Sequence, residues 1–199
     1  MNWILFALIG PALWAFVNHI DKYIISRYFT GRGVGSLVIF TSLSEIIISF
    51  LILIFARSEL HLAPMHAVMI GWSGALLVAS FIPYLHALQD GEASWASSLF
   101  QLIPVFGYFL GLIFLHEQLS FSQLFASLLI VGGAVTISLD LSETMRFRLK
   151  PFLLMALSAF MISVNALIFK MIALEASFWG TAFWEYIGGM IFGIFLFQA

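Results

Sequence analysis

The sequence predicts an all-α membrane protein with about seven transmembrane helices. Hydrophobic residues make up 62% of the 199 positions and charged residues 9%, and the mean hydropathy is +1.08. Soluble domains carry about 25% charged residues, so most of this surface must face lipid. The apolar runs reach about 20 residues, the length that crosses a bilayer core of about 30 Å, and they lack the alternation of barrel strands.

Composition also excludes several classes of function. The chain has no cysteine, which excludes disulfides, thiolate metal sites and cysteine nucleophiles. No basic stripe indicates nucleic-acid binding, and no motif indicates a metal, a cofactor or ATP. The first residues, Met1-Asn2-Trp3, lack the basic region of a secretory signal, so the first apolar run is predicted to be a retained helix.

The helices are predicted from their apolar runs and from the charges that end them. Asp21-Lys22 closes the first run and Arg57-Ser58-Glu59 the second. A glycine-rich segment, 27–35, separates these two runs, and without a preceding strand it is interpreted as a flexible turn rather than a phosphate loop. The predicted ranges are 3–22, 36–56, 67–88, 93–115, 121–139, 151–174 and 178–199.

A weak internal repeat organises these helices. Asn18, Lys22 and Glu45 occur in the first two runs, and Asn165, Lys170 and Glu185 in the last two. If the sixth helix restarts the pattern, the unit has five helices, and its odd number inverts the second unit as in many transporters. Chance similarity between apolar helices is the alternative. The predicted parts are a first repeat (1–141), a charged connector (142–150) and the start of a second repeat (151–199), which is expected to be truncated after its second helix.

Glu45 is the most informative single residue, because it lies midway along the second apolar run. A charged side chain at the bilayer centre costs about 2.5–3.5 kcal/mol on the insertion scale. The surrounding leucines, isoleucines and phenylalanines still allow insertion, but the cost must be met locally by protonation or by a partner. The two interpretations are a functional acid in a polar pathway and a protonated glutamate that only holds two helices together.

Other polar residues extend this predicted pathway along the faces of neighbouring helices. Asn18 and Lys22 share a face with Trp14 in the first helix, and Gln101 lies in a line of serines in the fourth. Because Lys170 recurs in the repeat, one expectation is that Lys22 and Lys170 face Glu45 or Glu185. Snorkelling of Lys22 to the interface and close packing by the serines are the competing explanations. The predicted substrate and coupling-ion pathway comprises Trp14, Asn18, Lys22, Glu45, Tyr84, Gln101, Tyr108 and Glu185.

Two pairs of glycines have the spacing of close-packed membrane helices. Gly107 and Gly111 form one pair and Gly189 and Gly193 the other. Such pairs let helices approach closely either within one chain or between two chains. The alternative to packing within the chain is therefore self-association of two copies through either pair.

The stretch 94–140 resembles half of an EamA-type transporter of the drug/metabolite transporter superfamily. The features that carry the resemblance are Leu102-Ile103-Pro104-Val105-Phe106, the turn Leu115-His116-Glu117-Gln118-Leu119-Ser120, and Gly132-Gly133. His116 stands where the family commonly has glycine. The resemblance implies two five-helix halves, a small-molecule substrate and, for this chain, the bacterial cytoplasmic membrane.

We therefore expect a secondary transporter of a small metabolite or an amphipathic organic compound, with protons or exchange as the driving force and Glu45 as the proton-coupled switch. The site is expected between the first four helices and their counterparts in the second half. An intramembrane lipid-modifying enzyme and a non-transporting scaffold subunit are the alternatives. Basic residues favour an external N-terminus, whereas the resemblance implies an internal one, and the sequence leaves the orientation open.

Overall fold

The computed structural model describes residues 3–28, 34–90, 93–118, 120–140, 146–147 and 149–198. Most of the predicted glycine-rich turn and of the charged connector lies outside these ranges. The described part is almost entirely helical, which confirms the predicted all-α fold. Its α-helices are α1 (Trp3–Tyr28), α2 (Val34–Phe55), α3 (Pro64–Asp90), α4 (Ala93–Leu99), α5 (Leu102–Phe114), α6 (Phe121–Ser138), α7 (Leu149–Glu175) and α8 (Phe178–Gln198).

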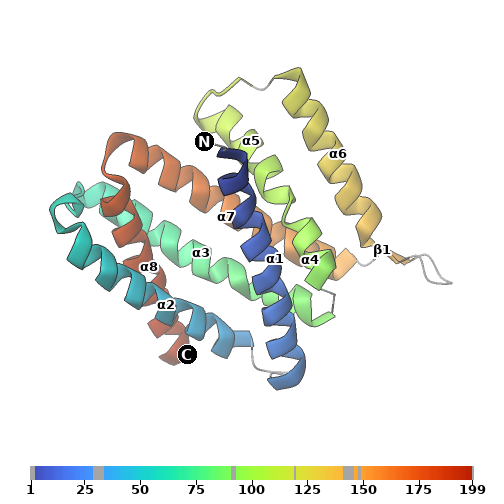
Figure 1. The fold of residues 1–199 in the computed structure, drawn as a ribbon, viewed down its shortest axis with the longest axis horizontal. Helices are drawn as coiled ribbons and strands as arrows, with labels where there is room; N and C mark the ends of the chain where they lie inside the picture. The colour runs from blue at the N-terminus through green and yellow to red at the C-terminus, as the bar shows by residue number, and fades with distance from the viewer. Residues whose placement is uncertain are drawn as a thin grey trace.

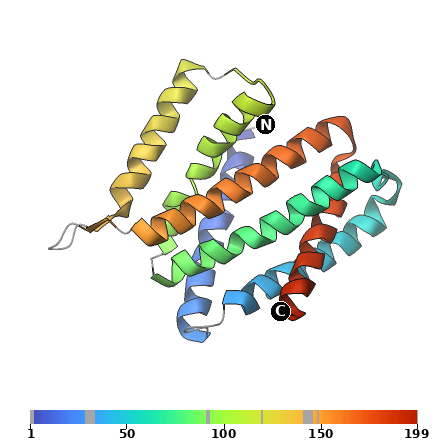
Figure 2. The ribbon, with the colours of Figure 1, turned by 180° about the vertical axis from the view of Figure 1, so that it is seen from behind.

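Helix α3 is the centre of the bundle. It packs against α7 along most of its length and against α8 on another face, while α2 lies across α8 (Figures 1 and 2). Helix α1 packs on α4 and α3, and α5 packs on α7. Helix α6 lies at the periphery and contacts mainly α5 and α4. The main buried core therefore lies between α3, α4 and α7, with Leu88, Leu99 and Met155 among its fully buried side chains.

Several helices have the length and composition of membrane spans. Among the described residues, Leu37–Phe55, Pro64–Gln89, Leu149–Glu175 and Phe178–Phe197 are long and apolar enough to cross a bilayer, and Leu102–Phe114 and Phe121–Gly133 are shorter apolar helices. Large apolar side chains such as Phe55, Trp72 and Phe121 are more than three-quarters exposed. Such a surface is stable only in contact with lipid.

The predicted fourth helix is broken in two. Pro104 has no N–H to donate to the carbonyl of Phe100, and its ring crowds that carbonyl. The Phe100 carbonyl instead accepts a bond from Ile103 N at 3.0 Å, and Gln101 N donates to the Ser98 carbonyl at 3.2 Å. These tighter bonds end α4 at Leu99 and start α5 at Leu102, so the single span 93–115 is two helices with a kink between them.

The end of α1 also differs from the prediction. The helix continues past Asp21 and Lys22 to Tyr28, because these two charged side chains bond to α3 and do not mark the water interface. A further difference is a two-residue antiparallel pairing that leads from α6 to α7, β1 (Leu139–Asp140) with β2 (Arg146–Phe147). No strand was expected from the sequence.

Candidate functional site

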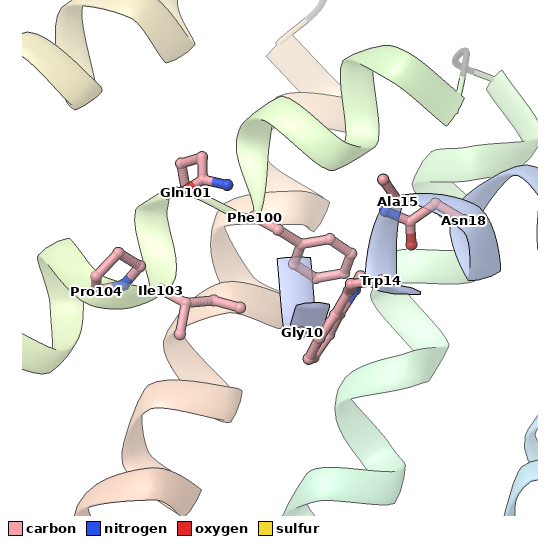
Figure 3. A pocket seen from close by; sticks show the side chains of 8 residues that line it. All are labelled: Gly10, Trp14, Ala15, Asn18, Phe100, Gln101, Ile103 and Pro104. Atoms are coloured by element: carbon pink, nitrogen blue, oxygen red, sulfur yellow. The ribbon is translucent and has the colours of Figure 1, made fainter. Parts of the chain in front are cut away.

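Within the described residues, the predicted pathway residues gather mainly in two separate places. The first is a cavity of about 390 Å³ between α1 and the α4–α5 kink, which we call the α1 cavity. It is lined by Gly10, Trp14, Ala15, Asn18, Phe100, Gln101, Ile103 and Pro104. Figure 3 shows these side chains, with α1 on one side and the kink on the other. The volume lies within the range of about 300–1,000 Å³ for small-molecule sites.

The kink shapes the cavity. Because the helix is interrupted between Leu99 and Leu102, Phe100 and Gln101 belong to neither α4 nor α5, and both line the opening towards α1. The ring of Phe100 lies edge-on to Trp14, with 5.4 Å between the ring centroids (Figure 3). The wall therefore includes two aromatic rings and two side-chain amides beside smaller apolar groups, and none of its described lining residues carries a charge.

A hydrogen-bond network fixes the polar end of this cavity. The Tyr84 hydroxyl on α3 lies 2.9 Å from Asn18 Oδ1 and 2.8 Å from Asp21 Oδ2 on α1, and its one proton is shared between these two acceptors. Asn18 and Tyr84 are both almost fully buried. Tyr84 also stacks against Phe100, with ring centroids 5.1 Å apart. One tyrosine thus holds α1 and the kink in place around the cavity.

Lys22 lies one turn beyond Asn18, and it faces the end of α3. Its Nζ donates to the carbonyl of Leu88 at 2.8 Å and to that of Gln89 at 3.3 Å. These carbonyls lie in the last turn of α3, where backbone acceptors lack helical partners and the helix dipole favours a cation. The residue therefore caps a helix, and the expectation that it faces Glu45 or Glu185 is wrong.

The second polar place, which we call the carboxyl pair, consists of Glu45 on α2 and Glu185 on α8. Both side chains are buried, with 6% and 7% of their surface exposed, and they lie on two helices that pack against each other. A Cβ built on Gly189, one turn after Glu185, would lie 2.7 Å from the Glu45 carboxyl carbon. The absence of a side chain at Gly189 is therefore what lets Glu45 reach α8.

The two carboxyls have different surroundings. Glu185 Oε1 accepts a hydrogen bond from Asn165 Nδ2 at 2.5 Å, and this amide also reaches Ser73 Oγ at 3.0 Å. Glu45 Oε2 is buried and has no hydrogen-bond partner among the described residues, and the same holds for Ser49 Oγ one turn further along α2. An unpartnered buried polar atom is costly. Trp95 Nε1 and Ser158 Oγ are also without a partner among the described residues, but Glu45 Oε2 belongs to the one ionisable side chain of this group.

The structure thus divides the predicted pathway. Trp14, Asn18 and Gln101 line the α1 cavity, and Tyr84 bonds to one of them. Glu45 and Glu185 lie together at the α2–α8 contact, and neither lines the cavity. Tyr108, which was predicted on the pathway, does not line it either and is partly exposed on α5.

Two further expectations can be compared with the structure. Lys170 forms an ion pair with Glu117 at the α5–α6 turn, and so does not face the carboxyl pair. Gly189 and Gly193 contact Glu45 and Ser42 of the same chain, so this pair of glycines is used within the bundle. At Gly107, by contrast, an added Cβ would meet no atom within 4 Å.

Some residues of these sites were missed by sequence reasoning. Asp21 looked like an interfacial anchor, because its position near the end of an apolar run gives no hint of Tyr84. Phe100 was not singled out, because nothing in the sequence distinguishes it from the other phenylalanines of the apolar runs. Asn165 was noticed only as a member of the repeat, and its position in the sequence gives no sign of its hydrogen bond to Glu185.

Comparison with known families decides the class of protein. The model of the EamA-like transporter family matches residues 1–139, which cover α1 to the first residue of β1. The chain belongs to the EamA-like transporter family. It is thereby an integral multi-pass membrane protein of the drug/metabolite transporter superfamily. No curated protein sequence matches it.

Both halves of the α1 cavity lie within the matched residues of this EamA-like chain, since α1, α4 and α5 all precede residue 139. The carboxyl pair differs, because Glu45 lies inside the match and Glu185 beyond it. The family assignment therefore bears directly on the cavity and only on one half of the pair.

Proposed function

We propose that this EamA-like protein is a secondary transporter of a small amphipathic organic compound, which binds in the α1 cavity. The observation that carries the proposal is the composition of the cavity wall, which combines the adjacent rings of Trp14 and Phe100 with the amides of Asn18 and Gln101. Aromatic faces bind a flat apolar group, and the amides orient a hydrogen-bonding group. Since the wall carries no charge, a neutral or zwitterionic compound fits better than an ion.

The kink next to the cavity supports a transport role. Irregular backbone is tolerated in a membrane where it lines a cavity, and interrupted helices commonly form transporter sites. Pro83 lies inside α3, directly before Tyr84. Pro104 gives the kinked wall of the cavity a point at which it can bend, and Pro83 does the same for the helix whose Tyr84 bonds to Asn18 of the other wall.

Glu45 is the proposed proton-coupled residue of this transporter. An ionisable group within a membrane helix is usually part of an ion or substrate pathway, and among the described residues Glu45 Oε2 has no hydrogen-bond partner. It lies outside the α1 cavity, so the proton and the organic compound would occupy different places. The proton and the compound therefore do not compete for a single site. Binding of one would affect binding of the other through the helices that lie between the two sites.

The test is uptake by purified protein in liposomes with an imposed pH gradient, using tritiated phenylalanine, tritiated uridine and a fluorescent amphipathic amine as probes. We expect uptake of phenylalanine or uridine above that of empty liposomes. Trp14→Ala is expected to reduce this uptake by at least about tenfold, the effect of about 1.4 kcal/mol. Trp72→Ala is the matched control, because Trp72 is 77% exposed on the outer face of α3.

Uptake of none of the probes, or equal uptake by Trp14→Ala and the native protein, would contradict the proposed use of the cavity. Uptake of the amine alone would contradict the preference for uncharged compounds. The use of the cavity would then be tested by measuring amine uptake in Trp14→Ala and Trp72→Ala.

A further inference from the structure

The described helices around the carboxyl pair supply no basic residue to neutralise it. Helices α2, α3 and α8, which pack together around it, contain no lysine or arginine. Two carboxylates this close in a low-dielectric interior cannot both stay ionised. The charge must therefore be reduced by a bound cation of some kind.

The titratable groups near the pair do not supply that cation. Tyr186 on α8 is close enough to interact with both carboxyls and can only add negative charge. The remaining titratable residues of α2, α3, α7 and α8 are His66, Tyr84, His86, Asp90, Lys150, Lys170 and Glu175. Of these, Lys170 pairs with Glu117, and His66 Nε2 lies 3.6 Å from Glu175 Oε2. Lys150 lies fifteen positions before Asn165 in α7, about 22 Å along a helix.

The donors around the pair favour a proton over a metal ion. Asn165 presents its amide nitrogen to Glu185, and an N–H group directed at the site repels a metal cation while stabilising a carboxylate. Glu45 Oε2 has no hydrogen-bond partner in the part of the chain that the structure describes. A proton on Glu45 removes the uncompensated charge there and requires no space or additional ligands.

We propose that Glu45 and Glu185 form a single proton-binding site, in which the two carboxyls hold one proton between them at neutral pH. Glu185, supported by Asn165 and Ser73, keeps the negative charge, and Glu45 carries the proton. Loading takes one proton from water and changes the charge of the pair from −2 to −1. The site joins the predicted halves of the chain, because each carboxyl comes from the second helix of its half.

This inference deepens the proposed function, since it names the ion site of the transporter, but it is tested without substrate. The protein is purified in detergent in choline chloride buffer. Infrared spectroscopy is expected to detect a protonated carboxyl at neutral pH in the native protein. The band should be absent from the double variant Glu45→Gln/Glu185→Gln and unchanged in Glu117→Gln, which alters an exposed glutamate.

Thermal stability provides the second measurement. As pH rises, the proton leaves and the two carboxylates repel each other. This repulsion should lower the thermal unfolding midpoint of the native protein by about 2–4 °C or more. Glu45→Gln and Glu185→Gln should each abolish this alkaline loss, and the double variant should do no more than either, because each removes the same repulsion. Glu117→Gln should retain the loss.

The outcomes separate the alternatives. A native protein without a protonated carboxyl band at neutral pH would overturn the proposal. Additive effects of Glu45→Gln and Glu185→Gln on the alkaline loss of stability would also overturn it, because they would mean that the two acids titrate independently. The thermal unfolding midpoint at alkaline pH is also compared in sodium chloride and in choline chloride. A higher midpoint in sodium chloride alone would assign the site to a metal cation instead. None of these results depends on transport, so failure of the proton site and failure of the proposed function remain distinguishable.

Discussion

Tyr84 on α3 places its hydroxyl 2.9 Å from Asn18 Oδ1 on α1, at the polar end of the α1 cavity. Eleven positions earlier on the same helix, Ser73 Oγ accepts a hydrogen bond from Asn165, which also bonds to Glu185. Eleven helical residues span about 16 Å. Helix α3 therefore contacts both polar places, and a shift of this helix would change the hydrogen bonds at each of them.

Tyr84→Phe is expected to destabilise the protein by about 1–3 kcal/mol, because Asn18 and Asp21 both lose the hydroxyl that satisfies them in a buried place. The loss should appear as a lower thermal midpoint in detergent and as weaker uptake of the transported probe. Tyr108→Phe is the matched control, since Tyr108 is partly exposed, and it should change the midpoint little. Equal effects of the two substitutions would argue against the network.

Glycine substitutions should separate close contacts from open helix faces. At Gly189 an added Cβ would overlap the Glu45 carboxyl, whereas at Gly132 it would meet no atom within 4 Å. Gly132→Ala should therefore stabilise the protein by about 0.5–1 kcal/mol, as expected for glycine replacement inside a helix. Gly189→Ala should destabilise it by about 1–3 kcal/mol through overpacking. Thermal midpoints of the two variants provide the comparison.

The absence of native cysteine allows the α1 cavity to be probed by single cysteines. A thiol at Gln101, which lines the cavity, should react with a water-soluble maleimide, and a thiol at Leu112, exposed on α5 to lipid, should not. A thiol reacts in water as its thiolate and is nearly inert in an apolar surrounding. Comparable labelling of both positions would mean that the cavity is not open to water.

Much of the fold follows from the sequence, because lipid imposes simple rules on it. The apolar runs around Ile47, Ile70 and Ile162 are long enough to span a bilayer, and their helices are found where expected. The break in the fourth helix was not expected. Pro104 alone does not determine whether a helix bends or stops, since this depends on the packing of Phe100 and Gln101 against α1.

The candidate sites were predictable as residues but not as groups. Glu45 and Asn18 were selected because polar side chains inside apolar runs are costly. Their separation into two places depends on how α2 and α1 pack, and the sequence pattern contains no information about inter-helix contacts. For the same reason Lys22 and Lys170 were expected near the acids, whereas they bond to the end of α3 and to Glu117.

The account depends most on Glu45 as the residue that couples protons to transport, and uptake by Glu45→Gln across pH tests this directly. Liposomes containing the native protein or the variant are tested with the same probe in two assays. One measures accumulation under an imposed pH gradient, and the other measures exchange with probe present on both sides of the membrane. We predict that the variant loses gradient-driven accumulation and its pH dependence, while exchange of probe across the membrane continues. Gradient-driven uptake with an unchanged pH profile in Glu45→Gln would contradict the account.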